Sequence, residues 1–194
     1  MYPIALHHIW CSLLKELLSR LGLYEAWHFQ TVENDKLFLS LVKQRLTDQF
    51  VQDWSARLES SSRAIFYRSI CDFKLQSYLK VLTISKFRYS IAQLRVSSHR
   101  LQVEEGRWKK PNPTPFTERK CISCNKLEDE YYFVLECNLY GELRNQYIPQ
   151  YYRNRPTMQK CVELLNSDNE SLIKKISVYT HMAFKTSNAV HYVL

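Results

Sequence analysis

The chain has 194 residues, of which 45% are hydrophobic and 13% are aromatic, and its formal net charge is +8. This composition is typical of a globular chain that holds a core without disulfides, and it excludes a disordered protein. Only three glycines occur, and no two of them are close together. Phosphate-binding glycine loops and dinucleotide fingerprints are therefore excluded, because both need clustered glycines. Asn-Gly hairpin turns are also missing, so we expect a mainly α fold.

The positive charge is concentrated in the middle third of the chain. Residues 61–120 carry 13 basic and 4 acidic side chains, a net charge of +9. The net charge of residues 1–60 is −1, and that of residues 121–194 is zero. Such a block is typical of a surface that binds a polyanion. The alternative is a set of solvated helix faces without a ligand.

The sequence also limits the compartment. No apolar run reaches about 18 residues, so we expect no membrane span. Charged residues and histidines interrupt the N-terminal apolar stretch, which makes it a poor signal peptide. We therefore expect a protein of the nucleus or cytoplasm that is not secreted, with its six cysteines present as thiols or metal ligands.

Apolar residues at helical spacing predict the main elements in chain order. Helices are expected over residues 4–21, 34–58 and 63–82, and from residue 85, with Asn34 capping the second. The third is expected to turn four side chains inward: Ile65, Leu75, Leu79 and Leu82. Two more helices should begin near Pro156 and Asn169.

The character of the sequence changes after Ser98. Residues 106–115 read GRWKKPNPTP, and their alternate prolines favour an extended, exposed strip. We predict an N-terminal helical region over residues 1–98 and a small irregular module over residues 99–148. C-terminal helices over residues 149–194 are expected to pack on the rest.

The strongest local motif is a group of three cysteines. Cys121 and Cys124 form a Cys-x-x-Cys loop, and Cys137 follows after twelve residues. A loop of this kind presents two thiolates to a tetrahedral zinc ion. Tyr132 stands five residues before Cys137, where a histidine ligand is usual, so the fourth ligand is His99, a water or nothing. The alternative is a set of buried thiols that has lost its metal.

A basic strip precedes this motif. Its cations can neutralise phosphates, and an exposed aromatic ring can stack on an unpaired base. The expected nucleic-acid-binding residues are Arg95, His99, Arg100, Arg107, Trp108, Lys109, Lys110, Arg119 and Lys120. For Trp108 the alternative is an anchor packed on the helical region. The adjacent carboxylates of residues 128–130 are interpreted as helix-capping groups, and we find no catalytic set.

Four blocks of the sequence resemble a known family. They are residues 94–101 (LRVSSHRL), 104–108 (EEGRW), 121–133, which hold the Cys-x-x-Cys loop and EDEYYF, and 137–140 (CNLY). Together they resemble the segment after the polymerase in animal non-LTR (LINE-type) retrotransposon polyproteins. The resemblance extends from about residue 37 to residue 188.

The resemblance implies a non-catalytic region that holds template RNA or target DNA for an upstream reverse transcriptase. Cys121, Cys124 and Cys137 match three ligands of the family's Cys/His zinc knuckle, and Tyr132 replaces the histidine. The polymerase signature, an aromatic-x-Asp-Asp turn, is absent, so the resemblance implies a fragment or a domesticated remnant that does not copy RNA.

We therefore expect a helical bundle followed by a zinc-knuckle-like module, with RNA or DNA as the partner and Zn²⁺ as the possible cofactor. The expected function is non-catalytic, sequence-independent nucleic-acid binding. The alternative is a protein-interaction module that docks on a partner such as a polymerase and binds no nucleic acid itself.

Overall fold

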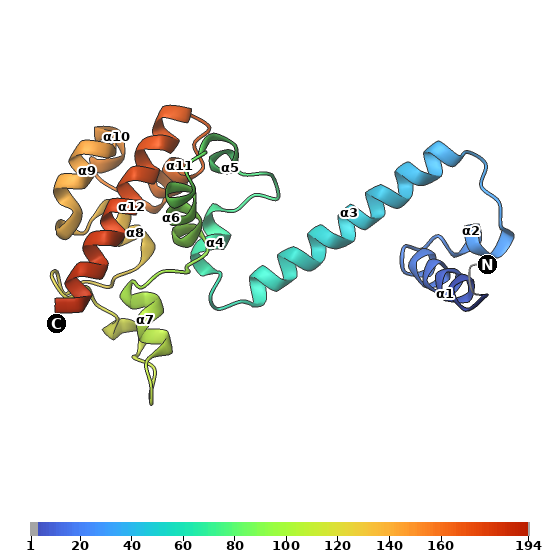
Figure 1. The fold of residues 1–194 in the computed structure, drawn as a ribbon, viewed down its shortest axis with the longest axis horizontal. Helices are drawn as coiled ribbons and strands as arrows, with labels where there is room; N and C mark the ends of the chain where they lie inside the picture. Colours follow the sequence, from blue (N-terminus) through green and yellow to red (C-terminus); the bar gives the residue numbers. More distant parts are fainter. Residues whose placement is uncertain (1–3, 194) are drawn as a thin grey trace. The chain divides into compact units, whose positions relative to one another are not determined.

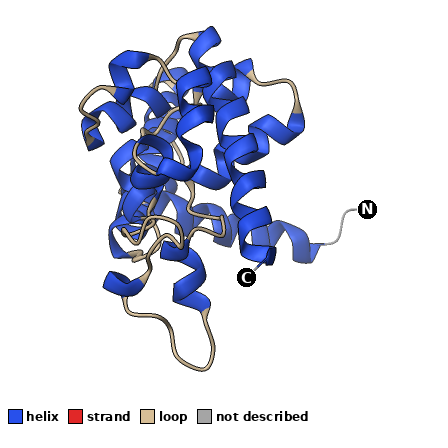
Figure 2. Cartoon of the chain, turned by 90° about the vertical axis from the view of Figure 1, so that its left-hand side faces the viewer, coloured by secondary structure: helices blue, strands red, loops and turns tan. Residues whose placement is uncertain are grey.

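The computed structural model describes the backbone of residues 4–193 and the side chains of residues 9–189. Within this range the chain consists of helices joined by loops (Figure 2), which confirms the mainly α prediction. The described residues form no strand, and their only β pairing is an isolated antiparallel bridge between Lys120 and Leu127.

The chain divides into two compact units, residues 1–60 and residues 61–194 (Figure 1). The division falls at the run of serines that begins with Ser60, and not after Ser98 as the sequence suggested. Residues 61–98 group with the C-terminal helices because they share one apolar core with them. Phe66, Leu82 and Leu94 are buried in the same cluster as Phe133 and Ile176.

The first unit contains α1 (Ile4–Arg20), α2 (Tyr24–Phe29) and α3 (Asp35–Ser60). Gly22 follows α1 with a φ of 66°, the left-handed conformation that commonly ends a helix. As predicted, Asn34 caps α3 by accepting a hydrogen bond from the Leu37 amide at 3.0 Å. No residue of α3 is buried, although apolar residues recur along it at helical spacing, and Leu37 remains 70% exposed.

The second unit begins with α4 (Ile65–Ile70), α5 (Ser77–Val81), α6 (Ser85–Arg95) and α7 (Gln102–Trp108). The predicted single helix over residues 63–82 is wrong, because residues 71–76 form a loop between α4 and α5. Cys71 is extended at the end of α4, and the Lys74 amide closes a turn on the Asp72 carbonyl at 2.7 Å. Of the four side chains expected inside, only Leu82 is buried.

The remaining elements follow a 3₁₀ turn, η1 (Phe116–Glu118). They are α8 (Glu130–Leu135), η2 (Asn138–Tyr140), α9 (Gly141–Tyr147), α10 (Gln150–Arg153), α11 (Met158–Leu165) and α12 (Glu170–Val193). The helices expected near Pro156 and Asn169 correspond to α11 and α12, and the amide of Lys160 bonds the Thr157 cap at 3.2 Å.

The core of the second unit is built around α12, which packs on α6 and α9 (Figure 1). Phe133 of α8 is fully buried and stacks on Phe184 of α12 with ring centroids 4.9 Å apart. The Tyr179 hydroxyl donates hydrogen bonds to the carbonyls of Phe133 and Val134 at 2.9 and 3.1 Å. These contacts fix α8 on α12, and α8 in turn positions the cysteine module.

Among the described residues, no helix combines the length and apolar character that crossing a bilayer requires.

Candidate functional site

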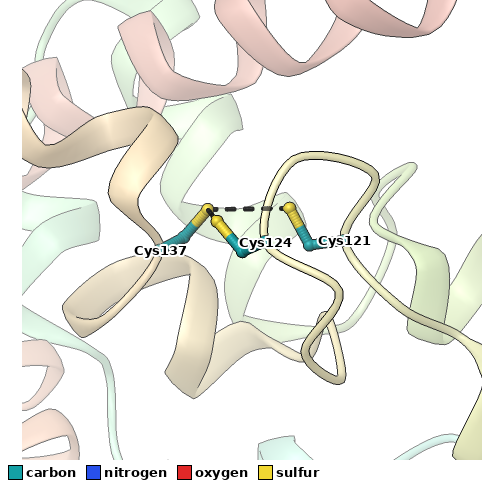
Figure 3. A group of neighbouring side chains, drawn as sticks. All are labelled: Cys121, Cys124 and Cys137. Carbon is teal, nitrogen blue, oxygen red and sulfur yellow. Dashed lines mark hydrogen bonds between the residues drawn. The ribbon is translucent and has the colours of Figure 1, made fainter.

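The three predicted cysteines come together in space (Figure 3). The Cys137 Sγ atom lies 3.8 Å from the Sγ atoms of both Cys121 and Cys124. All three sulfur atoms lie within 4.8 Å of one another, and the group could hold a metal ion. The six cysteines, all with described side chains, form no disulfide.

Local backbone hydrogen bonds shape the loop that carries two of these thiols. The Cys121 amide donates to the Lys126 carbonyl, and the Asn125 amide donates to the Cys121 carbonyl, both at 2.8 Å. Asn125 closes the turn with a φ of 54°, a conformation that asparagine tolerates better than most residues. Cys137 is brought to the loop by the end of α8, where its amide donates to the Tyr132 carbonyl at 2.8 Å.

The spacing of the sulfur atoms fits a tetrahedral metal ion. Zinc–thiolate bonds are about 2.3 Å long, so two ligands of a tetrahedron are separated by about 3.8 Å. The two Sγ–Sγ distances of 3.8 Å from Cys137 match that edge. The three cysteines could therefore hold a metal ion.

Tyr132 lies next to the three cysteines. Its side chain is buried, and its hydroxyl interacts with the thiols of Cys124 and Cys137. Burial and these sulfur contacts raise the pKa of the hydroxyl above its ordinary value. The phenol is thus a neutral neighbour of the thiols, at the sequence position where a histidine ligand would be usual.

The electrostatics of the group differ from one thiol to the next. Partial burial raises the pKa of Cys124, but hydrogen bonds from the Tyr132 hydroxyl and the Asn138 amide outweigh this effect and lower it to about 7. Burial raises the pKa of Cys121. Burial and the neighbouring Cys121 thiol raise the pKa of Cys137 to about 12. A divalent cation among the three sulfur atoms would supply the positive charge that favours all three thiolates.

His99 is not the fourth ligand. Its Nε2 atom lies 3.1 Å from Glu130 Oε1, its side chain is 1% exposed, and its ring packs on Phe184. Ser97 donates a hydrogen bond to the same carboxylate oxygen. The Ser-Ser-His block therefore ties α6 to the start of α8, and His99 is a structural residue and not part of an exposed strip.

Arg95 is also removed from the predicted interface. It is 1% exposed, and its guanidinium donates to the carbonyls of Leu165 and Ile70 at 2.8 and 3.0 Å. It also donates to Gln76 Oε1 at 2.7 Å and Asn166 Oδ1 at 3.1 Å. Burial lowers the pKa of Arg95. These hydrogen bonds join α6 to α4, α11 and the start of α5. A guanidinium buried among carbonyls cannot reach a phosphate, so Arg95 is a structural residue.

Two more of the predicted cations, Arg119 and Arg107, form hydrogen bonds or ion pairs within the protein. Arg119 donates to the Thr114 and Val103 carbonyls at 2.9 and 2.8 Å, which holds the loop after α7 against that helix. Arg107 lies 3.3 Å from Glu104 Oε1, and its side chain is 23% exposed. Both guanidinium groups serve first to build the module, with part of Arg107 still reaching the surface.

The remaining members of the strip are exposed. Lys109 and Lys110 lie in the loop that leaves α7, and Lys120 stands at the entry to the cysteine loop. Arg100 is exposed before α7. Trp108 ends α7 with 64% of its surface exposed, so it is not an anchor buried in the core.

Arg63 belongs to this surface but was missing from the predicted set. Its guanidinium carbon lies 5.7 Å from the centroid of the Trp108 ring. Its Nε atom lies 3.5 Å from Glu104 Oε2, and its side chain is 48% exposed. No local sequence pattern could have linked Arg63 to Trp108, because the two residues are 45 positions apart. Only the net positive charge of residues 61–120 pointed to a cation in this region.

No protein family, curated protein or solved structure matches the chain. The function therefore has to be inferred from the chemistry of these residues.

Proposed function

We propose that the chain is a non-catalytic nucleic-acid-binding segment, related to the region after the polymerase in LINE-type retrotransposon proteins. RNA or DNA is the ligand, and the upstream reverse transcriptase of such an element is a candidate partner. The observation that carries the proposal is that Lys109, Lys110, Lys120 and Trp108 are all exposed, in a unit with excess positive charge. Cations of this kind neutralise phosphates and release counterions.

Trp108 and Arg63 add a surface for bases. The indole is exposed, and the guanidinium of Arg63 lies over its ring at 5.7 Å. Aromatic rings and guanidinium planes are the groups on which unpaired bases stack, independently of sequence. The pair therefore favours binding that depends on the backbone charge and on stacking.

Zinc is the cofactor that we propose for the cysteine group. Cys121, Cys124 and Cys137 would hold it, with the fourth position open beside Tyr132. Bound zinc would supply folding free energy to the loop that carries Lys120. The proposed function does not depend on the metal, because Lys109, Lys110 and Trp108 lie outside the cysteine loop.

The test removes two positive charges and measures how the binding constant for nucleic acid then depends on salt concentration. Replacing Lys109 and Lys110 together by alanine should weaken binding and reduce the slope of log K against log salt by roughly two. The matched control removes two adjacent lysines on α12, Lys174 and Lys175, which are also exposed. An unchanged slope in the first variant would show that these lysines do not contact phosphates.

The runner-up is a protein-interaction module, and one observation favours it. The whole of α3 lacks a buried residue, and Leu39 and Phe50, which the helical period places on one face, are 66% and 61% exposed. Exposed apolar faces of this kind are typical of docking surfaces. Sedimentation of the purified chain would support this function if self-association disappeared in a Leu39→Ser, Phe50→Ser variant while nucleic-acid binding was absent.

A further inference from the structure

A cavity of about 420 Å³ opens between α4, α7 and the start of α8. Phe66 and Val103 form its buried apolar wall. Ser69, Phe116 and Met158 lie at its exposed rim. Its volume falls within the range of small-molecule sites, roughly 300–1,000 Å³, and its walls combine aromatic rings with a few polar groups.

Two buried polar atoms of the lining residues have no hydrogen-bond partner. They are Oε2 of Glu104, an acceptor, and Nε of Arg107, a donor. The Glu104 side chain is buried, and its Oε1 atom lies 3.3 Å from a terminal guanidinium nitrogen of Arg107. Its Oε2 atom lies 3.5 Å from Arg63 Nε, which is an ion contact but not a hydrogen bond. A buried polar atom without a hydrogen bond is unfavourable. A ligand that offered one donor and one acceptor would pair both atoms.

The cavity adjoins the basic surface. Arg63 and Glu104 also line a second hollow of about 460 Å³, together with Arg100 and Trp108. The Arg63–Glu104 ion pair therefore stands between the apolar cavity and the surface proposed to hold phosphates. A ligand seated in the cavity would remain within reach of those cations.

We propose that this cavity takes one unpaired nucleobase of a single-stranded nucleic acid. A nucleobase is flat and apolar on its faces, and its edge carries adjacent donors and acceptors. It therefore matches both the aromatic wall and the unpaired atoms of Glu104 and Arg107. The backbone of the same strand would lie along Arg63, Arg100 and Trp108. This inference rests on the proposed function and adds that the chain selects single strands.

The experiment compares two labelled oligomers of about twelve nucleotides, one of deoxythymidine and one with the same backbone but without bases. Both carry the same phosphates, so their difference in affinity measures the contribution of bases. The natural chain should bind the intact oligomer roughly tenfold more tightly, as the typical contribution of a stacked base suggests. Fluorescence anisotropy at fixed salt gives both dissociation constants.

A variant that obstructs the cavity tests whether the base binds there. Ser69→Trp puts an indole at the exposed rim of the cavity, and Ser171→Trp puts one at an exposed position of α12 outside both hollows. Ser69→Trp should reduce the preference for the intact oligomer to within about twofold and leave the salt slope unchanged, because it removes base contacts and not phosphate contacts. Ser171→Trp should retain the preference.

Glu104→Met is a second variant with a side chain of similar length, and it tests the acceptor if Ser69→Trp does not fold. It should lower the preference at least about threefold, since methionine has no carboxylate oxygen to accept a hydrogen bond from the base.

Three results would overturn the inference. The two oligomers could bind alike, both variants could keep the full preference, or the preference could vanish only in Trp108→Ala. If the two oligomers bound alike but with a steep salt slope, only this inference would fail, and the proposed function would still be supported. If neither oligomer bound at about 50 mM salt, the proposed function itself would fail.

Discussion

Replacing Arg95 by methionine tests whether the most buried cation of the chain is structural. Methionine has a similar length and fills much of the same space without charge. The substitution removes four hydrogen bonds, of which two end on the backbone carbonyls of Ile70 and Leu165. The side-chain amides of Gln76 and Asn166 are only half-buried and can turn toward water, but the carbonyls cannot.

The expected magnitude follows from those two carbonyls. Each buried acceptor without a partner costs about 1–3 kcal/mol, so the pair costs roughly 2–6 kcal/mol. Part of this loss is offset because the guanidinium no longer has to be desolvated. We therefore expect the free energy of unfolding to fall by about 3 kcal/mol, a large share of the 5–15 kcal/mol of a typical domain.

Urea unfolding followed by far-ultraviolet circular dichroism measures this change. Lys109→Met is the control, because it removes a cation from an exposed position and should shift the free energy of unfolding by less than about 0.5 kcal/mol. A structural role for Arg95 would be refuted if Arg95→Met kept the free energy of unfolding within about 1 kcal/mol while weakening RNA binding. That pattern would mean that Arg95 contacts phosphate, as the sequence had suggested.

Three further substitutions test other parts of the structure. Gly106→Ala would place a Cβ atom 2.8 Å from Arg119 Cγ and 3.2 Å from Thr114 Cβ, so the midpoint of urea unfolding should fall by the equivalent of about 1–3 kcal/mol. Tyr132→His adds a nitrogen ligand beside the three cysteines, and zinc affinity measured by competition with a chelator should rise at least about tenfold; an unchanged affinity would reject Tyr132 as the neighbour of the open position. Burial lowers the pKa of His181, as do Lys185 and Lys86, so the unfolded state takes up the proton first as the pH falls. Stability should therefore decline below about pH 6.5 in the natural chain and less steeply in His181→Gln, which urea unfolding at pH 7 and pH 5.5 would check; equal slopes would contradict this assignment.

The long helices could be predicted from the sequence because their apolar residues recur over several turns. Ile91 and Leu94 of α6, and Ile173 and Ile176 of α12, are buried as their spacing indicated. The same spacing failed over residues 63–82, where Leu75 is 62% exposed in the loop before α5. Helices of four to seven residues, such as α7 and α10, are too short for a periodic pattern to be read.

The candidate site was predictable only where its residues are close in sequence. The spacing of Cys121, Cys124 and Cys137 brought three sulfur atoms together as expected. Arg95 was assigned to the surface because it is charged, although it lies four residues after the buried Ile91 and so shares its helix face. Its carbonyl partners are 25 and 70 residues away along the chain, and no local pattern shows them.

The most direct test of the central claim is the binding of the full chain to a labelled single-stranded RNA across a range of salt. Three exposed lysines of the strip, Lys109, Lys110 and Lys120, are each expected to neutralise one phosphate. We therefore expect binding at low salt and a slope of log K against log salt between about −2 and −3, or steeper. A slope near zero, or no binding at about 50 mM salt, would contradict it.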